Sequence, residues 1–110
     1  MSSDIYEKAI VDIKKYDSNA DDALVAALSK NYAIVMRKRD SASVACSDKK
    51  ELTSVKTNFL KKKLGLTISE DDMDVALKDV CTTMKDSRMK SRITVYYLLT
   101  KKFSKESVFI

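Results

Sequence analysis

The sequence predicts an all-α protein, a compact bundle of about five or six short helices in a single domain over residues 1–110. The chain contains one glycine and no proline, and it has no Asn-Gly pair. β-Hairpins depend on such residues for their turns, whereas helical connections can use the frequent serine, aspartate and asparagine residues. Apolar side chains also recur at helical spacing in several segments. A length of 110 residues suits one domain and leaves no room for two.

The first two predicted helices cover residues 4–16 and 20–30. In each, apolar side chains recur three or four residues apart, which places them on one face of a helix. These positions are Ile5, Ala9, Ile13, Leu24, Ala27 and Leu28. Asn19 is the expected N-cap of the second helix, because its side chain can accept a hydrogen bond from a free backbone amide. Residues 32–36 fit either a buried strand or a helical turn, and a short turn is expected at residues 40–46.

The clearest predicted helix is the fourth, which starts after residue 47 or 48 and ends at Gly65. Asp48 and Glu51 have the spacing of a capping box, in which each side chain binds a backbone amide near the other residue. The apolar face consists of Leu52, Val55, Phe59 and Leu60. Gly65 is the only glycine of the chain and follows directly on this helix. We therefore expect it to hold a positive φ and to stop the helix.

The fifth predicted helix begins at Ser69, and the sixth covers residues 87–103. Acidic residues at 70–72 suit the positively polarised start of the fifth helix. Its apolar positions are Met73, Ala76, Leu77, Val80, Cys81 and Met84. The sixth helix contains the β-prone stretch 93–97, so its assignment depends on the helical context as much as on the local pattern.

The two cysteines, Cys46 and Cys81, are expected to be reduced thiols. The start of the chain is charged and has no signal-peptide core, and its longest apolar run is six residues, 23–28. A membrane span needs about 20 apolar residues. We therefore predict a cytoplasmic protein with no membrane contact, in a compartment where thiols stay reduced. Cys81 is expected to be buried, whereas Cys46 precedes a helix start, where the pKa of a thiol can fall and make it reactive.

No pattern in the sequence indicates catalysis, a metal site or a cofactor. The chain has no histidine, which removes the commonest general base and metal ligand, and two cysteines alone cannot complete a tetrahedral zinc site. The acidic residues 70–74 lack the alternating ligands and the glycine of a calcium loop. We predict that the protein is not an enzyme. An enzyme whose site is assembled from dispersed tyrosine, arginine and aspartate residues is a weaker alternative.

Charge alternates in sign along the chain, although the net charge is +5. Residues 1–30 carry −2, residues 31–64 carry +6, residues 65–86 carry −4 and residues 87–110 carry +5. Two interpretations follow. Acidic and basic helices can lie beside each other and offset their charges, or the basic segments can merge into one positive face that attracts an anionic partner.

Basic residues are the best candidates for contact with an anion or a partner. The candidates are Arg37, Lys38, Arg39, Arg88, Lys90 and Arg92. Because the segment 88–92 is expected to open a helix, its cations lie at the unfavourable end of the helix dipole. The compensating anion is expected to be the acidic start of the fifth helix, the pair Asp21 and Asp22, or an external phosphate. Residues 61–63 form a further basic segment, at a helix end that favours cations.

Three stretches of the sequence resemble a known family. They are IKKYD at residues 13–17, MRKRDSASVACSDKKELTSVKTNFLKKKLGL at residues 36–66 and MKDSRMKSRITVYYLL at residues 84–99. Together they resemble a family of short bacterial proteins, domain of unknown function 2853. The resemblance covers most of the chain in the same order and implies a small all-helical bacterial domain. It differs where relatives have Asp-Pro at the start of the fourth helix, since this chain has Asp48-Lys49. The resemblance implies no activity and no functional residues.

The function that the sequence predicts is that of a non-enzymatic module acting through contacts with an unknown protein partner. The alternative is a weak nucleic-acid-binding domain that uses the basic segments 37–39, 61–63 and 88–92. Internally paired or solvated charge is favoured over phosphate binding, because the isoelectric point of about 9.2 is only moderately basic. The sequence does not indicate an oligomeric state.

Overall fold

The computed structural model describes residues 2–38, 41–87 and 90–110 and confirms the all-α prediction. Its elements are α1 (Ser2–Lys14), α2 (Asp22–Asn31), α3 (Ala33–Arg37), β1 (Ser43–Val44), α4 (Lys49–Ser54), η1 (Val55–Lys63), α5 (Glu70–Thr83), β2 (Lys90–Ser91), α6 (Arg92–Lys102) and η2 (Glu106–Val108). The two strands form the only sheet among the described residues. The ambiguous stretch 32–36 therefore belongs mainly to a short helix, α3.

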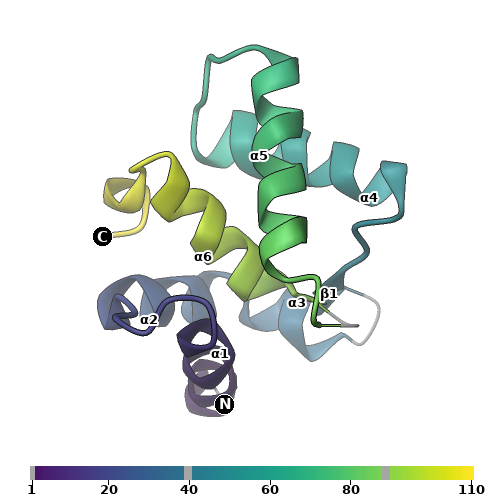
Figure 1. Ribbon diagram of the computed structural model, residues 1–110. Coiled ribbons are helices and arrows are strands. Elements are labelled where there is room, and N and C mark those ends of the chain that lie inside the picture. Colours follow the sequence, from purple (N-terminus) through teal and green to yellow (C-terminus); the bar gives the residue numbers. More distant parts are fainter. Residues whose placement is uncertain (1, 39–40, 88–89) are drawn as a thin grey trace.

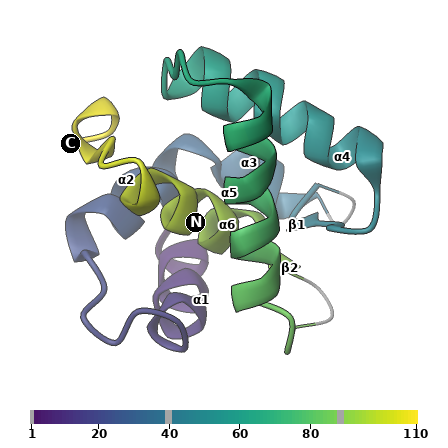
Figure 2. The ribbon, with the colours of Figure 1, turned by 45° about the horizontal axis from the view of Figure 1, so that its top comes forward.

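The central element of the fold is α6. It lies between α1 and α2 on one side and α5 on the other (Figures 1 and 2), and it contacts all three helices. All residues from 92 to 97 are buried, as are Leu99 and Thr100. A helix that is enclosed on nearly every side has little need of a polar face. This enclosure explains why the β-prone stretch 93–97 is helical, since tertiary packing outweighs local propensity.

The start of the predicted sixth helix is wrong by five residues. Residues 90 and 91 form β2, which pairs antiparallel with β1, so that Ser43 lies opposite Ser91 and Val44 opposite Lys90. The backbone N–H of Arg92 extends this pairing by donating to the carbonyl of Ala42 over 2.9 Å. The turn expected over residues 40–46 therefore includes a strand. Its partner is more than 40 residues away in the sequence, so the local pattern does not reveal the pairing.

The predicted N-caps are confirmed in part. The Ser69 hydroxyl accepts a hydrogen bond from the backbone N–H of Asp72 over 3.1 Å, as expected for the start of α5. The Asp48 carboxylate likewise caps α4 by accepting from the N–H of Lys50 over 2.9 Å. The cap of α2 is Asp21, however, and the prediction of Asn19 is wrong. The capping box is incomplete, because the Glu51 carboxylate binds Arg92.

The predicted fourth helix changes its winding at Val55. Residues 49–54 form α4, and η1 continues the same helix with π-type hydrogen bonds, which join residues five apart. The buried side chains of η1 and its end are Val55, Phe59, Leu60 and Leu64. At the end, the N–H of Leu66 donates to the carbonyl of Leu60 over 3.0 Å. Gly65 has a φ of 67°, which confirms the predicted left-handed stop.

We expect Gly65→Val to lower the free energy of unfolding by about 1 kcal/mol or somewhat more, because a β-branched residue is disfavoured at positive φ. A Cβ atom at this position has no heavy atom within 4 Å, so a steric clash with other residues adds nothing to the cost. Urea denaturation measures the change. Gly65→Asn is the matched control, since asparagine tolerates this conformation and should cost less. Equal stability of the valine variant and the original protein would contradict the assignment.

Candidate interaction groove

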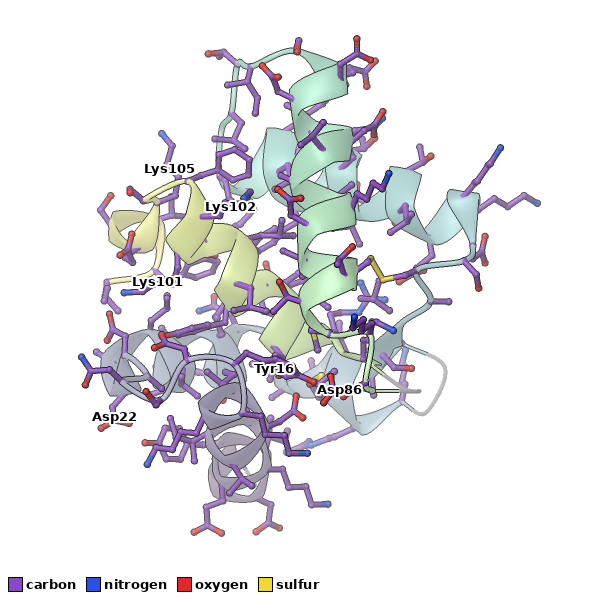
Figure 3. All side chains as sticks on the ribbon, viewed as in Figure 1. Tyr16, Asp22, Asp86, Lys101, Lys102 and Lys105 are labelled. Carbon is purple, nitrogen blue, oxygen red and sulfur yellow. A yellow bond between two sulfur atoms is a disulfide. The ribbon has the colours of Figure 1, made fainter. Side chains whose placement is uncertain are left out.

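Cys46 and Cys81 form a disulfide, so the prediction of two reduced thiols is wrong. Their Cα atoms are 6.1 Å apart, although the residues are separated by 35 positions in the sequence. Cys81 is also only partly buried, contrary to expectation. In Figure 3 the yellow sulfur–sulfur bond joins α5 to the chain that leads into α4. No local pattern in the sequence indicates this proximity, because it arises where the β1–α4 connection passes the last turns of α5.

The disulfide lines a groove between α5 and the helix formed by α4 and η1. The groove has a volume of about 460 Å³. Its lining residues are Cys46, Lys49, Leu52, Thr53, Lys56, Asp74, Leu77, Lys78 and Cys81. Apolar surface comes from the two leucines and the disulfide, and charge comes from three lysines and one aspartate. The groove thus combines apolar side chains with positive ammonium groups.

The three lysines of the groove differ in their partners. The Lys56 ammonium lies 2.9 Å from the Asp74 carboxylate and 3.6 Å from that of Glu70. The hydrogen bond to Asp74 raises the pKa of Lys56 above its ordinary value. Within the described part of the chain, neither Lys49 nor Lys78 forms an ion pair. Lys49 and Lys78 therefore supply the charge that is available to a bound anion.

Arg92 is held inside the protein, and its side chain is only about 10% exposed. Its guanidinium donates to the carbonyl of Ser41 over 2.6 Å, to the Tyr96 hydroxyl over 2.9 Å and to the Glu51 carboxylate. Burial alone would lower the pKa of Arg92, but Tyr96 and Glu51 outweigh that effect and raise it. The compensating anion is thus Glu51, and neither the start of α5 nor the Asp21–Asp22 pair supplies it.

The model of the family described as "Protein of unknown function (DUF2853)" matches residues 8–107. The chain belongs to this family. No curated protein shows significant sequence similarity to it. The resemblance of the three sequence stretches to this family is therefore confirmed. The family has no assigned function, so membership in it does not indicate an activity.

Three further basic candidates of this DUF2853 protein, Arg37, Lys38 and Lys90, lie within the described residues. Arg37 ends α3 and Lys38 follows it, and both are exposed. Lys90 is partly buried in β2, and its ammonium donates to the carbonyl of Ser87 over 2.9 Å. Arg39 and Arg88 lie outside the described residues. The strand pairing joins the segment after Lys38 to the segment that contains Lys90, a proximity that the sequence did not predict.

The third basic segment, residues 61–63, ends η1. Lys61 lies 2.9 Å from Glu70, and its hydrogen bond lowers the pKa of that carboxyl group. Lys63 lies over the ring of Phe109, 5.2 Å from its centroid. Lys102 of α6 pairs with Asp79 of α5 over 3.1 Å. The two ion pairs, Lys61 with Glu70 and Lys102 with Asp79, support the interpretation that acidic and basic segments of the DUF2853 chain offset one another.

Buried tyrosines form internal hydrogen bonds. The Tyr97 hydroxyl donates to the Asp17 carboxylate over 2.5 Å and accepts from the backbone N–H of Asp21 over 2.9 Å. Burial, aided by the hydrogen bond to Asp17, raises the pKa of Tyr97 to about 12. Burial also raises the pKa of Tyr32 to about 12. At the surface, Tyr16 donates to Asp86 over 3.0 Å, and Figure 3 shows the two side chains next to each other. The hydroxyls of Tyr97 and Tyr16 thus act as structural donors.

The described residues also contain neither a metal-binding cluster nor a membrane-spanning helix. No group of three or more histidine, cysteine, aspartate or glutamate side chains has an arrangement that could hold a metal ion. None of the described helices is long and apolar enough to cross a membrane. The predicted cytoplasmic location stays a prediction. The groove is the site that the sequence analysis missed, and the only sequence signal for it is the helical spacing of Leu77, Lys78 and Cys81 on α5.

Proposed function

We propose that this DUF2853 protein is a non-enzymatic interaction module whose groove binds an acidic segment of a partner protein. The observation that carries the proposal is the apolar lining by Leu52, which is partly exposed, and Leu77, which is almost fully buried, beside the ammonium groups of Lys49 and Lys78, which form no ion pair with the described residues. A volume of about 460 Å³ accommodates a few side chains. The preferred ligand is therefore a short peptide segment with both apolar and acidic residues.

Charge complementarity selects the acidic ligand. Lysine ammonium groups at the edge of a groove attract carboxylates over several ångströms, and this attraction raises the association rate and rejects basic segments. Lys56 adds no further attraction, because Asp74 and Glu70 already neutralise it. The apolar contact supplies the part of the affinity that does not depend on salt.

Nucleic-acid binding by the segments 37–39, 61–63 and 88–92 has less support. Arg92 and Lys61 are engaged by Glu51 and Glu70, so their charges are already compensated. Single-strand binders also expose aromatic rings on which bases stack. The rings of Tyr32, Phe59 and Tyr96 instead pack against one another, with Phe59 and Tyr96 stacked at a centroid distance of 3.9 Å.

A selection from a library of random 12-residue peptides tests the proposal. We expect the protein to enrich peptides that combine aspartate or glutamate with leucine, isoleucine or phenylalanine. Nuclear magnetic resonance titration with an enriched peptide should shift the amide signals of Leu52, Thr53, Leu77 and Lys78. The double variant Lys49→Glu with Lys78→Glu should bind this peptide at least about tenfold more weakly.

Lys50→Glu is the matched control, because Lys50 is exposed on α4 but does not line the groove. It should bind the peptide as the original protein does. Enrichment of basic peptides, or signal shifts confined to another surface, would contradict the proposal. A gel shift with duplex DNA at low and high salt tests the alternative. Strong retention that falls steeply with salt, together with no peptide enrichment, would favour nucleic-acid binding.

A further inference from the structure

The Cys46–Cys81 disulfide lies at the surface of the groove, outside the hydrophobic core. Both cysteines are partly buried, and both line the groove. Core residues such as Phe59, Leu60 and Met84 are completely buried and do not line the groove. A small molecule that enters the groove therefore reaches the sulfur atoms without unfolding the protein. Accessible disulfides are the ones that exchange with external thiols.

We propose that the Cys46–Cys81 disulfide is a reversible thiol–disulfide exchange centre for low-molecular-weight thiols that carry carboxylate groups. Lys49 and Lys78, which form no ion pair within the described part of the chain, supply the selectivity. Lys49 follows Cys46 by three residues at the start of α4. On α5, Lys78 precedes Cys81 by three residues, so Lys78 and Cys81 lie on the same face of that helix. Both lysines line the groove together with the disulfide.

The lysines favour exchange in two ways. They attract a thiol that carries a carboxylate and so raise its local concentration at the sulfur atoms. They also stabilise the cysteine thiolate that leaves when the disulfide opens, because a nearby cation favours the charged form of a thiol. The carboxylate of Asp74 in the groove is already paired with Lys56 and therefore opposes these effects only weakly.

The exchange balances in two steps. The thiolate of the small thiol attacks one cysteine sulfur, the bond between Cys46 and Cys81 breaks, and the other cysteine leaves as a thiolate that takes up the proton. A second thiolate then attacks the mixed disulfide and releases the first cysteine. The protein gains two electrons and two protons as a dithiol, while two small thiols become their disulfide. The same small disulfide reverses the reaction.

The rates of reduction of the native protein by three small thiols test this proposal. The probes are 3-mercaptopropionate, 2-mercaptoethanol and cysteamine, which are similar in size and are anionic, neutral and cationic. Alkylation followed by mass spectrometry counts the free thiols. After correction for the thiolate fraction of each probe, we expect the anionic probe to react about fivefold faster than the neutral one. The cationic probe should be the slowest, and 3,3′-dithiodipropionate should restore the disulfide.

Charge variants show whether the lysines cause this order. Lys49→Glu with Lys78→Glu should reverse the order of the three probes. Lys49→Gln with Lys78→Gln should remove the differences in rate between the probes, and it replaces the glutamate variant if that variant does not fold. Lys50→Glu should leave the order of the probes unchanged. Equal corrected rates for all probes would overturn the proposal. So would a reduction rate that does not depend on thiol concentration, since opening would then follow global unfolding. Because these probes contain no peptide, the result is separate from that of the peptide selection.

Discussion

Replacement of Cys46 and Cys81 together by serine is expected to lower the free energy of unfolding by about 4 kcal/mol. The disulfide closes a loop between residues 35 positions apart, and that loop contains α4, η1 and most of α5. In the unfolded chain the bond removes the many conformations in which these residues lie far from each other. Loss of the bond restores that entropy to the unfolded state and so favours unfolding.

Guanidinium denaturation of the original protein and of the double serine variant, without reductant, measures this difference. The original protein in a strong phosphine reductant is the matched comparison, and it should unfold close to the midpoint of the variant. A higher value of m in the variant is also expected, because its unfolded state is more extended. A stability difference below about 1 kcal/mol would contradict a disulfide of this loop length in the native protein.

Glu51→Ala is expected to lower the free energy of unfolding by about 3 kcal/mol. The substitution leaves the Arg92 guanidinium, whose side chain is about 10% exposed, without its carboxylate partner. A buried charge that loses its partner retains the cost of desolvation but not the compensating attraction. The expected loss lies at the lower end for such pairs, because the Glu51 side chain is 25% exposed.

Two further variants separate the effect of this pair from that of a general loss of charge. Glu51→Leu with Arg92→Met removes both charges and should be more stable than Glu51→Ala alone, because no unpaired charge stays buried. Glu70→Ala removes a carboxylate from an exposed pair and should have little measurable effect. Unfolding midpoints in urea give all three values. Equal stability of Glu51→Ala and Glu70→Ala would show that the Arg92 pair is not buried in solution.

The parts of the fold that depend on neighbouring residues could be predicted from the sequence. A cap such as Ser69 acts on an amide three residues away, and a glycine stop such as Gly65 acts on the turn before it. The apolar spacing along a helix is equally local. These signals were sufficient for the fold class, for the helix starts at Asp48 and Ser69 and for the end of η1.

The parts that depend on distant residues could not be predicted. Glu51 and Arg92 are separated by 41 residues. A glutamate at position 51 suits both a capping box and an internal ion pair, so the sequence does not distinguish the two roles. The pairing of Cys46 with Cys81 depends on how the β1–α4 connection crosses α5. For both reasons the residues predicted from the sequence as functional candidates lie in the basic segments, and the groove beside the disulfide was not predicted.

The central position of α6 has a consequence for the order in which the protein acquires its structure during synthesis. α6 follows every other α-helix in the chain, yet α1, α2 and α5 all pack against it. When residues 1–91 have left the ribosome, these helices lack the surface that their apolar faces cover in the finished fold (Figure 2). The surfaces that α6 covers therefore stay exposed in the nascent chain until residues 92–102 emerge, and only then can the domain fold as a unit.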